Sequence, residues 1–211
     1  MIKQEHLDEF IEHVKLASQN PNFRHHQWFV RFHLEVVEKI ALEACEIYTE
    51  ADKDFVRLLC WLHDYGKIID FDNQYDLTIT EGERKLKEIG FEDEVVTRAI
   101  ESMKIIDAKV FDDIKAALIE VQIISSADAA SHHVGPFFTL WWYENPNKTV
   151  EQLLQDNIEK SDKDWNRKMV LPEIRDAFAS RRKTLEEHSG KLPDRYLSKV
   201  VGKSYNYILN E

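Results

Sequence analysis

The sequence has few of the residues that cross-link or interrupt a chain. Its 211 residues include two cysteines, five prolines and six glycines, and no Pro/Gly/Ser-rich or low-complexity stretch divides it. Cys45 and Cys60 lie among apolar residues at inward-facing helical positions, which predicts reduced core thiols. The length and the missing linker predict a single domain over residues 1–211.

Long apolar runs and a basic N-terminal segment are also missing. No run approaches the ~20 apolar residues needed to cross a bilayer. The residues Met1–Glu5 lack the basic-then-apolar pattern of a signal peptide. The sequence therefore predicts a cytoplasmic protein that does not engage membranes.

Positive charge is scarce overall but unevenly distributed. The formal net charge of −11 argues against a general nucleic-acid binder, because its field would repel polyphosphate backbones. Between Lys160 and Lys203, however, 12 Lys/Arg residues stand against 7 Asp/Glu residues. A solvated basic helix is the simpler interpretation of this segment, and a surface that attracts phosphate is the alternative.

Apolar residues recur with helical period through most of the chain, and strand-period alternation is scarce. We therefore predict an all-α fold, a helical bundle. Capping boxes at Thr80/Glu83 and Thr149/Gln152 predict two helix starts. The other expected helices follow apolar stripes at Leu7–Val14, Phe29–Ala44, Phe55–Leu62, Val95–Met103, Ile114–Ile124 and Ile174–Leu185.

Several breaks between these helices are also expected. Asn20-Pro21 should end the first helix, Gly66 the third and Gly135-Pro136 the one before the aromatic run. The polar stretch Ile68–Thr78 should be a loop. The aromatic run Phe137–Tyr143 is expected to pack in the core or as a lid, with stacking on a base as the alternative.

One set of polar residues stands out against this apolar background. His63-Asp64 lies at the end of a predicted helix, His33 interrupts an apolar stripe upstream, and Asp128 lies in an apolar helix downstream. Neighbouring helical side chains point about 100° apart, so the adjacent pair can reach one ion where its helix ends. Two imidazoles and two carboxylates suit a divalent cation of borderline hardness.

Each residue also has a plainer interpretation. His33 alone would be a hydrogen-bonded core histidine, but it faces the same core as His63. A lone carboxylate at Asp128 would be costly to bury unless it were paired or metal-bound. The set of four is therefore the stronger indication of a metal site.

These residues resemble the signature of the HD-domain superfamily of metal-dependent phosphohydrolases. The resemblance covers about residues 25–135, and the local context matches too, with Gly66-Lys67 after His63-Asp64 and alanines on both sides of Asp128. It implies an HD-type helical bundle, with residues 136–211 as additional C-terminal helices. It also implies the metal ligands His33, His63, Asp64 and Asp128.

The resemblance further limits the number of ions. Branches of the superfamily with two metals use extra histidines between the His-Asp pair and the last Asp, and none occurs from Tyr65 to Ala127. We expect one divalent ion, with Mn, Mg, Co, Ni or Fe(II) compatible with the ligand set. Glu101 could touch a second ion, although a solvated helix face is its simpler interpretation.

Catalytic and substrate-binding roles follow from the same resemblance. Asp64 could both hold the ion and accept a proton from water. Lys67 stands where some nucleotidase branches place a catalytic Glu, and we expect it to bind a substrate phosphate rather than lie free on the surface. Arg24 and His132 are further candidates for substrate binding, although His132 could instead serve the end of its helix.

The predicted function is hydrolysis of a small phosphorylated substrate, in particular a nucleotide, by a metal-activated water. A non-catalytic module that binds metal and nucleotide is the alternative. A structural metal site is disfavoured, because this ligand mix leaves coordination positions open. No motif specifies the substrate or the oligomeric state.

Overall fold

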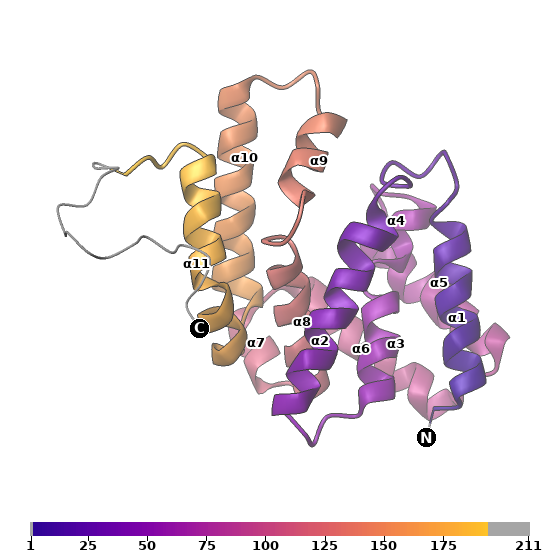
Figure 1. Cartoon of the computed structure of the whole chain (residues 1–211). Coiled ribbons are helices and arrows are strands. Elements are labelled where there is room, and N and C mark those ends of the chain that lie inside the picture. Colours follow the sequence, from indigo (N-terminus) through magenta and orange to yellow (C-terminus); the bar gives the residue numbers. More distant parts are fainter. Residues whose placement is uncertain (1, 194–211) are drawn as a thin grey trace.

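The computed structural model describes residues 2–193, and this part of the chain forms helices and no strands (Figure 1). The all-α prediction is confirmed. Two π-helical segments, η1 (Val30–Leu34) and η2 (Asp164–Lys168), lie among the α-helices. The α-helices are α1 (Gln4–Ala17), α2 (Glu35–Ile47), α3 (Lys53–Leu62), α4 (Tyr65–Ile69), α5 (Gln74–Ile89), α6 (Asp93–Ala108), α7 (Phe111–Ala116), α8 (Ile119–Ser131), α9 (Phe137–Glu144), α10 (Val150–Lys163) and α11 (Pro172–His188).

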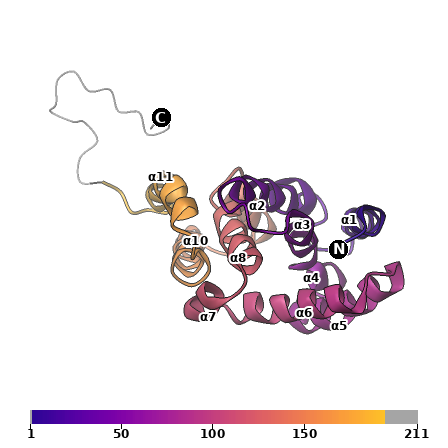
Figure 2. The same ribbon diagram turned by 90° about the horizontal axis from the view of Figure 1, so that it is seen from below.

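Helix α8 is the centre of the bundle. It packs against α2 and α3 on one side and against η2 and α11 on the other. Nearly every residue from Glu120 to Ser131 is buried, as expected for a helix surrounded by others. Viewed from below, α1 lies at one end of the molecule and the pair α10 and α11 at the other (Figure 2). Residues of α8 can therefore meet side chains from both halves.

The periodic helices form largely where the apolar stripes predict them. The four apolar residues of the Leu7–Val14 stripe are buried in α1, although this helix ends at Ala17, before Asn20-Pro21. The capping box of Thr149 with Gln152 begins α10, and Gly90 ends α5 in the left-handed conformation with φ 101°. No helix among the described residues is long and apolar enough to cross a membrane.

The structure corrects the prediction that Gly66 ends the third helix. Helix α3 ends at Leu62, Asp64 leaves helical geometry with φ −119° and ψ 18°, and Gly66 lies inside α4. A Cβ atom on Gly66 would lie 2.0 Å from the Gln74 carbonyl oxygen and 2.5 Å from the Thr78 nitrogen. Glycine is needed here because α4 touches the backbone of α5, where Gly66 N donates to Thr78 Oγ1 at 2.9 Å.

Two other predicted boundaries are wrong. Helix α5 begins at Gln74 instead of Thr80, and the Thr80 hydroxyl donates to the Asp76 carbonyl inside that helix. The stripe expected to form one helix from Ile114 to Ile124 is split between α7 and α8, because Ala117 adopts an extended backbone with ψ 179°. Apolar period alone does not mark such local changes of backbone direction.

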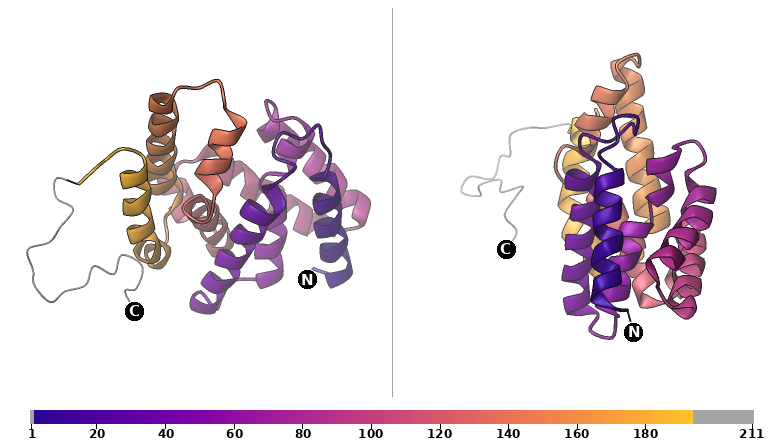
Figure 3. Two further views of the ribbon diagram at one scale, coloured as in Figure 1. Left: turned by 45° about the horizontal axis from the view of Figure 1, so that its top comes forward. Right: turned by 90° about the vertical axis from the view of Figure 1, so that its right-hand side faces the viewer.

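The C-terminal helices stand beside the bundle and reach over one end of it. Helix α9 connects α8 to α10 and rises away from the central helices (Figure 3). None of its residues is fully buried, so of the two predicted places for the aromatic run, core or lid, the core is wrong. Its ring side chains face a cavity instead, which is described below.

Candidate metal centre

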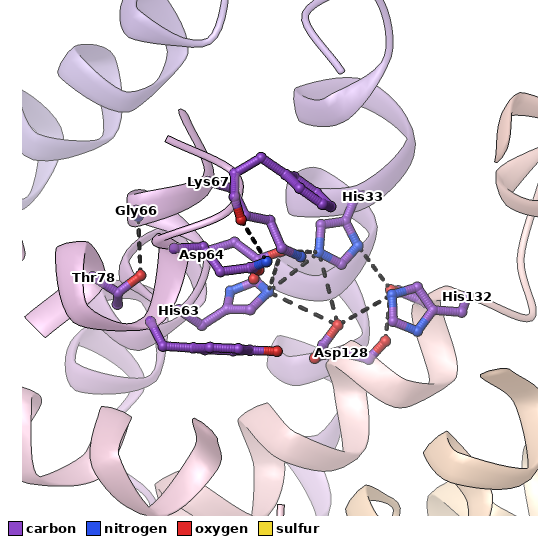
Figure 4. A network of polar contacts seen from close by, with 12 residues as sticks. His33, His63, Asp64, Gly66, Lys67, Thr78, Asp128 and His132 are labelled. Atoms are coloured by element: carbon purple, nitrogen blue, oxygen red, sulfur yellow. Dashed lines mark hydrogen bonds and ion pairs between the residues drawn. The ribbon is translucent and has the colours of Figure 1, made fainter. Parts of the chain in front are cut away.

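The four predicted metal ligands converge at one point in the bundle (Figure 4). His33 comes from η1, His63 caps the end of α3, Asp64 joins α3 to α4, and Asp128 comes from α8. The Nε2 atom of His33 lies 3.2 Å from Nε2 of His63, 3.0 Å from Oδ2 of Asp64 and 3.7 Å from Oδ1 of Asp128. His63 Nε2 lies 3.5 Å from the same Asp64 oxygen. All four side chains are at least largely buried.

Backbone irregularities position two of these residues. His33 lies in a π-helical turn, a rare element that is frequent at functional sites. The sequence prediction of one continuous α-helix over this stripe is therefore wrong at its start. Asp64 lies where α3 gives way to α4, so its side chain and that of His63 both point to the centre.

The hydrogen bonds assign the proton on each imidazole. His63 Nδ1 lies 2.7 Å from the Cys60 carbonyl oxygen, which can only accept, so Nδ1 carries the proton. The Ser131 hydroxyl donates to the Asp128 carbonyl at 2.7 Å and so accepts from Nδ1 of His33 at 3.1 Å. Both Nε2 atoms are therefore left with a lone pair.

These lone pairs face one another and face carboxylate oxygens. Two acceptor nitrogens in van der Waals contact, next to the carboxylates of Asp64 and Asp128, repel one another unless a cation lies between them. Burial lowers the pKa of His33, so an added proton is disfavoured as that cation. The groups therefore fit a divalent ion with nitrogen and oxygen ligands.

His132 belongs to the same cluster, one turn after Asp128 on α8. Its Nδ1 donates to Asp164 Oδ2 at 2.8 Å, and its Nε2 faces Asp128 Oδ1 at 3.4 Å. Its ring stacks on His33 with centroids 5.3 Å apart. Burial, followed by the Lys160 charge, lowers the pKa of His132 to about 3, so this ring too is neutral. The sequence pointed to substrate binding here, whereas the geometry makes His132 a possible further ligand.

Each acidic member of the cluster is also bonded to a lysine. Lys168 donates to Asp128 Oδ2, which leaves Oδ1 directed at the histidines. Lys67 donates to Asp64 Oδ2 at 2.5 Å. Burial alone would raise the pKa of both carboxyl groups, but these ammonium groups hold it well below its usual range. The low pKa keeps Asp64 charged, which fits a ligand role, and its role as proton acceptor stays a prediction.

Three residues that contact this centre were not predicted from the sequence. Lys160, Asp164 and Lys168 recur at intervals of four in the segment interpreted as a solvated basic helix. Asp164 is buried and accepts from Lys160 at 2.7 Å and from His132, while Lys168 is buried against Asp128. The spacing of four residues could have indicated their common role, since it places all three side chains on one face of a helix.

A cavity of about 400 Å³ opens onto the cluster. The predicted residues His33, His63, Asp64, Lys67, Asp128 and His132 all line it. Its cationic lining consists of Lys67, Lys109, Lys160, Lys163 and Lys168. Its aromatic lining includes Trp28, Phe29, Phe71, Tyr75, Phe137, Phe138 and Trp141.

Arg24 does not reach this cavity. Its guanidinium donates to Asn145 Oδ1 at 2.9 Å and lies 5.3 Å from the centre of the Trp141 ring. Glu144 accepts from Trp28 Nε1 at 2.6 Å and lies 2.7 Å from His25 Nδ1. Arg24 therefore helps to fasten the end of α9 over the cavity, and the structure does not support its predicted contact with substrate.

Glu101 also lies away from the centre. It is exposed on α6 and pairs with Lys104 at 2.6 Å. This matches its interpretation as part of a solvated helix face.

Fold and site together define a helical protein with a buried His/Asp cluster of the kind found in metal-dependent phosphohydrolases. Residues 30–132 match the sequence model of the HD domain, so the chain contains an HD domain over these residues, with further helices beyond it. Comparison with curated proteins and with solved structures gave no significant match.

Proposed function

We propose that this protein is a metal-dependent phosphohydrolase that acts on a small phosphorylated substrate, in particular a nucleotide. The observation that carries the proposal is the set of unprotonated Nε2 atoms on His33 and His63, which face the carboxylates of Asp64 and Asp128 at the base of a cationic cavity. Lone pairs and carboxylates supply a cation site, and the lysines supply a phosphate site beside it.

His33, His63, Asp64 and Asp128 would hold the ion, with His132 next to them. Because an imidazole nitrogen binds one ion, the two groups of candidate ligands that share His33 describe one centre, and we propose a single Mn, Mg, Co, Ni or Fe(II) ion. When bound, such an ion polarises a phosphoryl oxygen and lowers the pKa of a coordinated water.

The lysines of the cavity would neutralise the substrate and the charge that grows on its phosphoryl oxygens. Lys67 donates to the same Asp64 oxygen that faces both histidines. A cation held at that oxygen would repel the Lys67 ammonium, which would then be available to a phosphate oxygen. Lys168 keeps Asp128 charged through the other carboxylate oxygen and so maintains its ligand role.

The aromatic lining supports a nucleotide as the substrate. Phe137, Phe138 and Trp141 of α9 face the cavity, with Trp28 and Phe71 also on its wall. Flat rings of this kind can stack on a base. A volume of about 400 Å³ lies within the range of small-molecule sites.

A panel of phosphorylated metabolites tests the proposal. Metal-stripped protein would be supplied with Mn, Co, Ni, Mg or Fe(II) and assayed for released phosphate on nucleoside mono-, di- and triphosphates and on sugar phosphates. We expect metal-dependent release that is lost in His63→Ala and retained in Glu101→Gln. Nucleotide binding without release under every metal would overturn hydrolysis and favour the non-catalytic binding module.

A further inference from the structure

Two cavity lysines are left without an acidic partner by the contacts described so far. Lys67, Lys160 and Lys168 each bond a carboxylate of the centre. Lys109 and Lys163 line the same cavity, and neither forms an ion pair with any acidic residue in the described part of the chain. The two lysines come from the ends of α6 and α10, helices far apart in the sequence.

The two ammonium groups are close enough to act on one another. Both lysines line the same cavity as Tyr75, whose hydroxyl accepts from Lys109 at 2.5 Å. Burial lowers the pKa of Lys163, and the positive charge of Lys109 lowers it further, as does that of Lys168. Lys163 therefore lies within electrostatic reach both of Lys109 and of Lys168, which touches the proposed metal ligand Asp128. Two like charges that line one cavity, neither of them in an ion pair, favour an anion between them.

Lys109 has an unusual backbone that supports a functional role. It ends α6 with φ 54° and ψ 39°, and it is the only non-glycine residue with positive φ among the described residues. Residues with a strained backbone are frequent at binding sites, where the surrounding structure holds them in that conformation. The conformation brings the Lys109 ammonium 4.4 Å from the centre of the Tyr75 ring and 2.5 Å from its hydroxyl, to which it donates. The hydroxyl proton of Tyr75 remains free to donate to a ligand.

No neighbouring acidic group is bonded to either lysine in the described part of the chain. Asp164, whose negative charge reaches Lys163, is bonded to Lys160 and His132 instead. Asp107 lines the cavity two residues before Lys109, and its Oδ2 is buried without a hydrogen-bond partner. No hydrogen bond or ion pair among the described residues joins the Asp107 carboxyl group to Lys109 or Lys163. Glu159 accepts from Gln155 at 2.8 Å and forms no ion pair with Lys109 or Lys163.

From this arrangement we infer that Lys109, Lys163 and the Tyr75 hydroxyl form a second anion subsite at the mouth of the cavity, which binds a second phosphoryl group of the substrate. The inference rests on the proposed function, because the first phosphoryl group would lie at the metal centre. The second group could belong to a diphosphate or to a separate ester further along the substrate. In either case the enzyme favours doubly phosphorylated substrates over monoesters of the same size.

Phosphonates test the subsite without any turnover, because their P–C bonds are not hydrolysed. Isothermal titration calorimetry on the Mn-loaded full chain would compare alkylphosphonates with α,ω-alkylene diphosphonates of the same carbon number, from one to six carbons. We expect at least one diphosphonate to bind about tenfold more tightly than its monophosphonate. The best carbon number distinguishes a diphosphate-like ligand from one with two separate esters.

Variants of the lysines assign that preference to the subsite. Lys109→Gln and Lys163→Gln should each weaken the diphosphonate by about three- to tenfold, since charge-assisted contacts are partly screened at a cavity mouth. Binding of the monophosphonate should stay within about twofold of its original value. Lys104→Gln is the matched control, because Lys104 is exposed on the same helix as Lys109 and pairs with Glu101.

The outcomes separate this inference from the proposed function. Absence of a diphosphonate preference, or equal loss of both ligand types in the lysine variants, would overturn the subsite even if phosphate release is observed with nucleotides. A loss in Lys104→Gln as large as in the other two would show a general effect of net charge and overturn it as well. A preference lost only in Lys109→Gln and Lys163→Gln supports the subsite, whether or not any substrate is hydrolysed.

Discussion

The Nε2 atoms of His33 and His63 lie 3.2 Å apart, and the hydrogen bonds at Nδ1 fix the tautomer of each neutral ring that has its lone pair on Nε2. A neutral imidazole donates from one ring nitrogen and accepts at the other. Here the Cys60 carbonyl accepts a hydrogen bond from Nδ1 of His63, and the Ser131 hydroxyl accepts one from Nδ1 of His33. The pair is thus arranged in advance to accept a cation, and the carboxylates of Asp64 and Asp128 supply the opposing charge.

Metal binding should depend on this pair. His63→Ala removes one lone pair, and we expect metal affinity to fall at least about a hundredfold, since even outer-shell changes cost 10–100-fold. The increase in Tm that Mn produces in the unmodified protein should disappear. Metal analysis and thermal unfolding with and without Mn would measure both. Glu101→Gln is the control, and an equal loss of metal there would indicate a second ion.

The buried pair of Asp128 and Lys168 predicts a stability effect separate from metal binding. Asp128→Ala leaves the Lys168 ammonium buried, with Asp164 at 3.9 Å as its remaining acidic neighbour. Removal of one partner of a buried ion pair costs about 3–5 kcal/mol, and the nearby carboxylate places our expectation at the lower end. The double variant Asp128→Ala/Lys168→Met should recover more than half of the lost free energy of unfolding. Urea denaturation of the metal-free proteins would measure it, and a double variant no more stable than Asp128→Ala would contradict the pairing.

Lys67 should affect substrate and not the metal. Lys67→Met removes a charge-assisted contact to a phosphate, worth about 1.5–3 kcal/mol, so kcat/KM should fall roughly ten- to hundredfold. Stoichiometric metal should remain, because the side chain carries no lone pair at neutral pH and is not a ligand. The assay uses whichever phosphate ester the panel identifies. An unchanged kcat/KM in metal-replete Lys67→Met would show that this lysine does not contact the substrate.

Asp107 should make the metal-free protein less stable as the pH rises. The pKa of Asp107 in the folded state is about 7, above its ordinary value of 3.8. Between these two pH values the folded protein keeps the proton on Asp107, whereas the unfolded chain has lost it. The resulting stability is complete below the unfolded pKa and is lost as the pH rises through about 7. Asp107→Asn should therefore exceed the unmodified protein in Tm by several degrees at pH 8 and by less at pH 5. The scans need a chelator, because a bound cation would lower the pKa of Asp107, and a difference independent of pH would refute the assignment.

Much of the centre could be predicted because its residues carry their own local context. His63-Asp64 followed by Gly66-Lys67, and Asp128 between alanines, are short patterns that do not depend on knowing the packing. The apolar stripes likewise identified most helices, because burial of one helical face imposes a period on the sequence.

The remaining parts depend on tertiary contacts that leave no such pattern. Lys168 and Asp164 look like members of a solvated basic helix until η2 is packed on α8, which buries both. Gly66 looks like a helix end, but its lack of a side chain serves the contact with α5. Arg24 looks available to a phosphate, but Asn145, distant in the sequence, engages it.

Each π-helical segment holds one residue more per turn than an α-helix would. In η1 this extra residue lies between Trp28, which is bonded to Glu144 of α9, and the helix α2 that continues from His33. Deletion of one residue between Trp28 and His33 would restore the α-helical repeat and rotate the two relative to one another by about 100°. At this place a change of length by one amino acid would separate the metal ligand from the aromatic wall, although every side chain that contacts the ion would still be present.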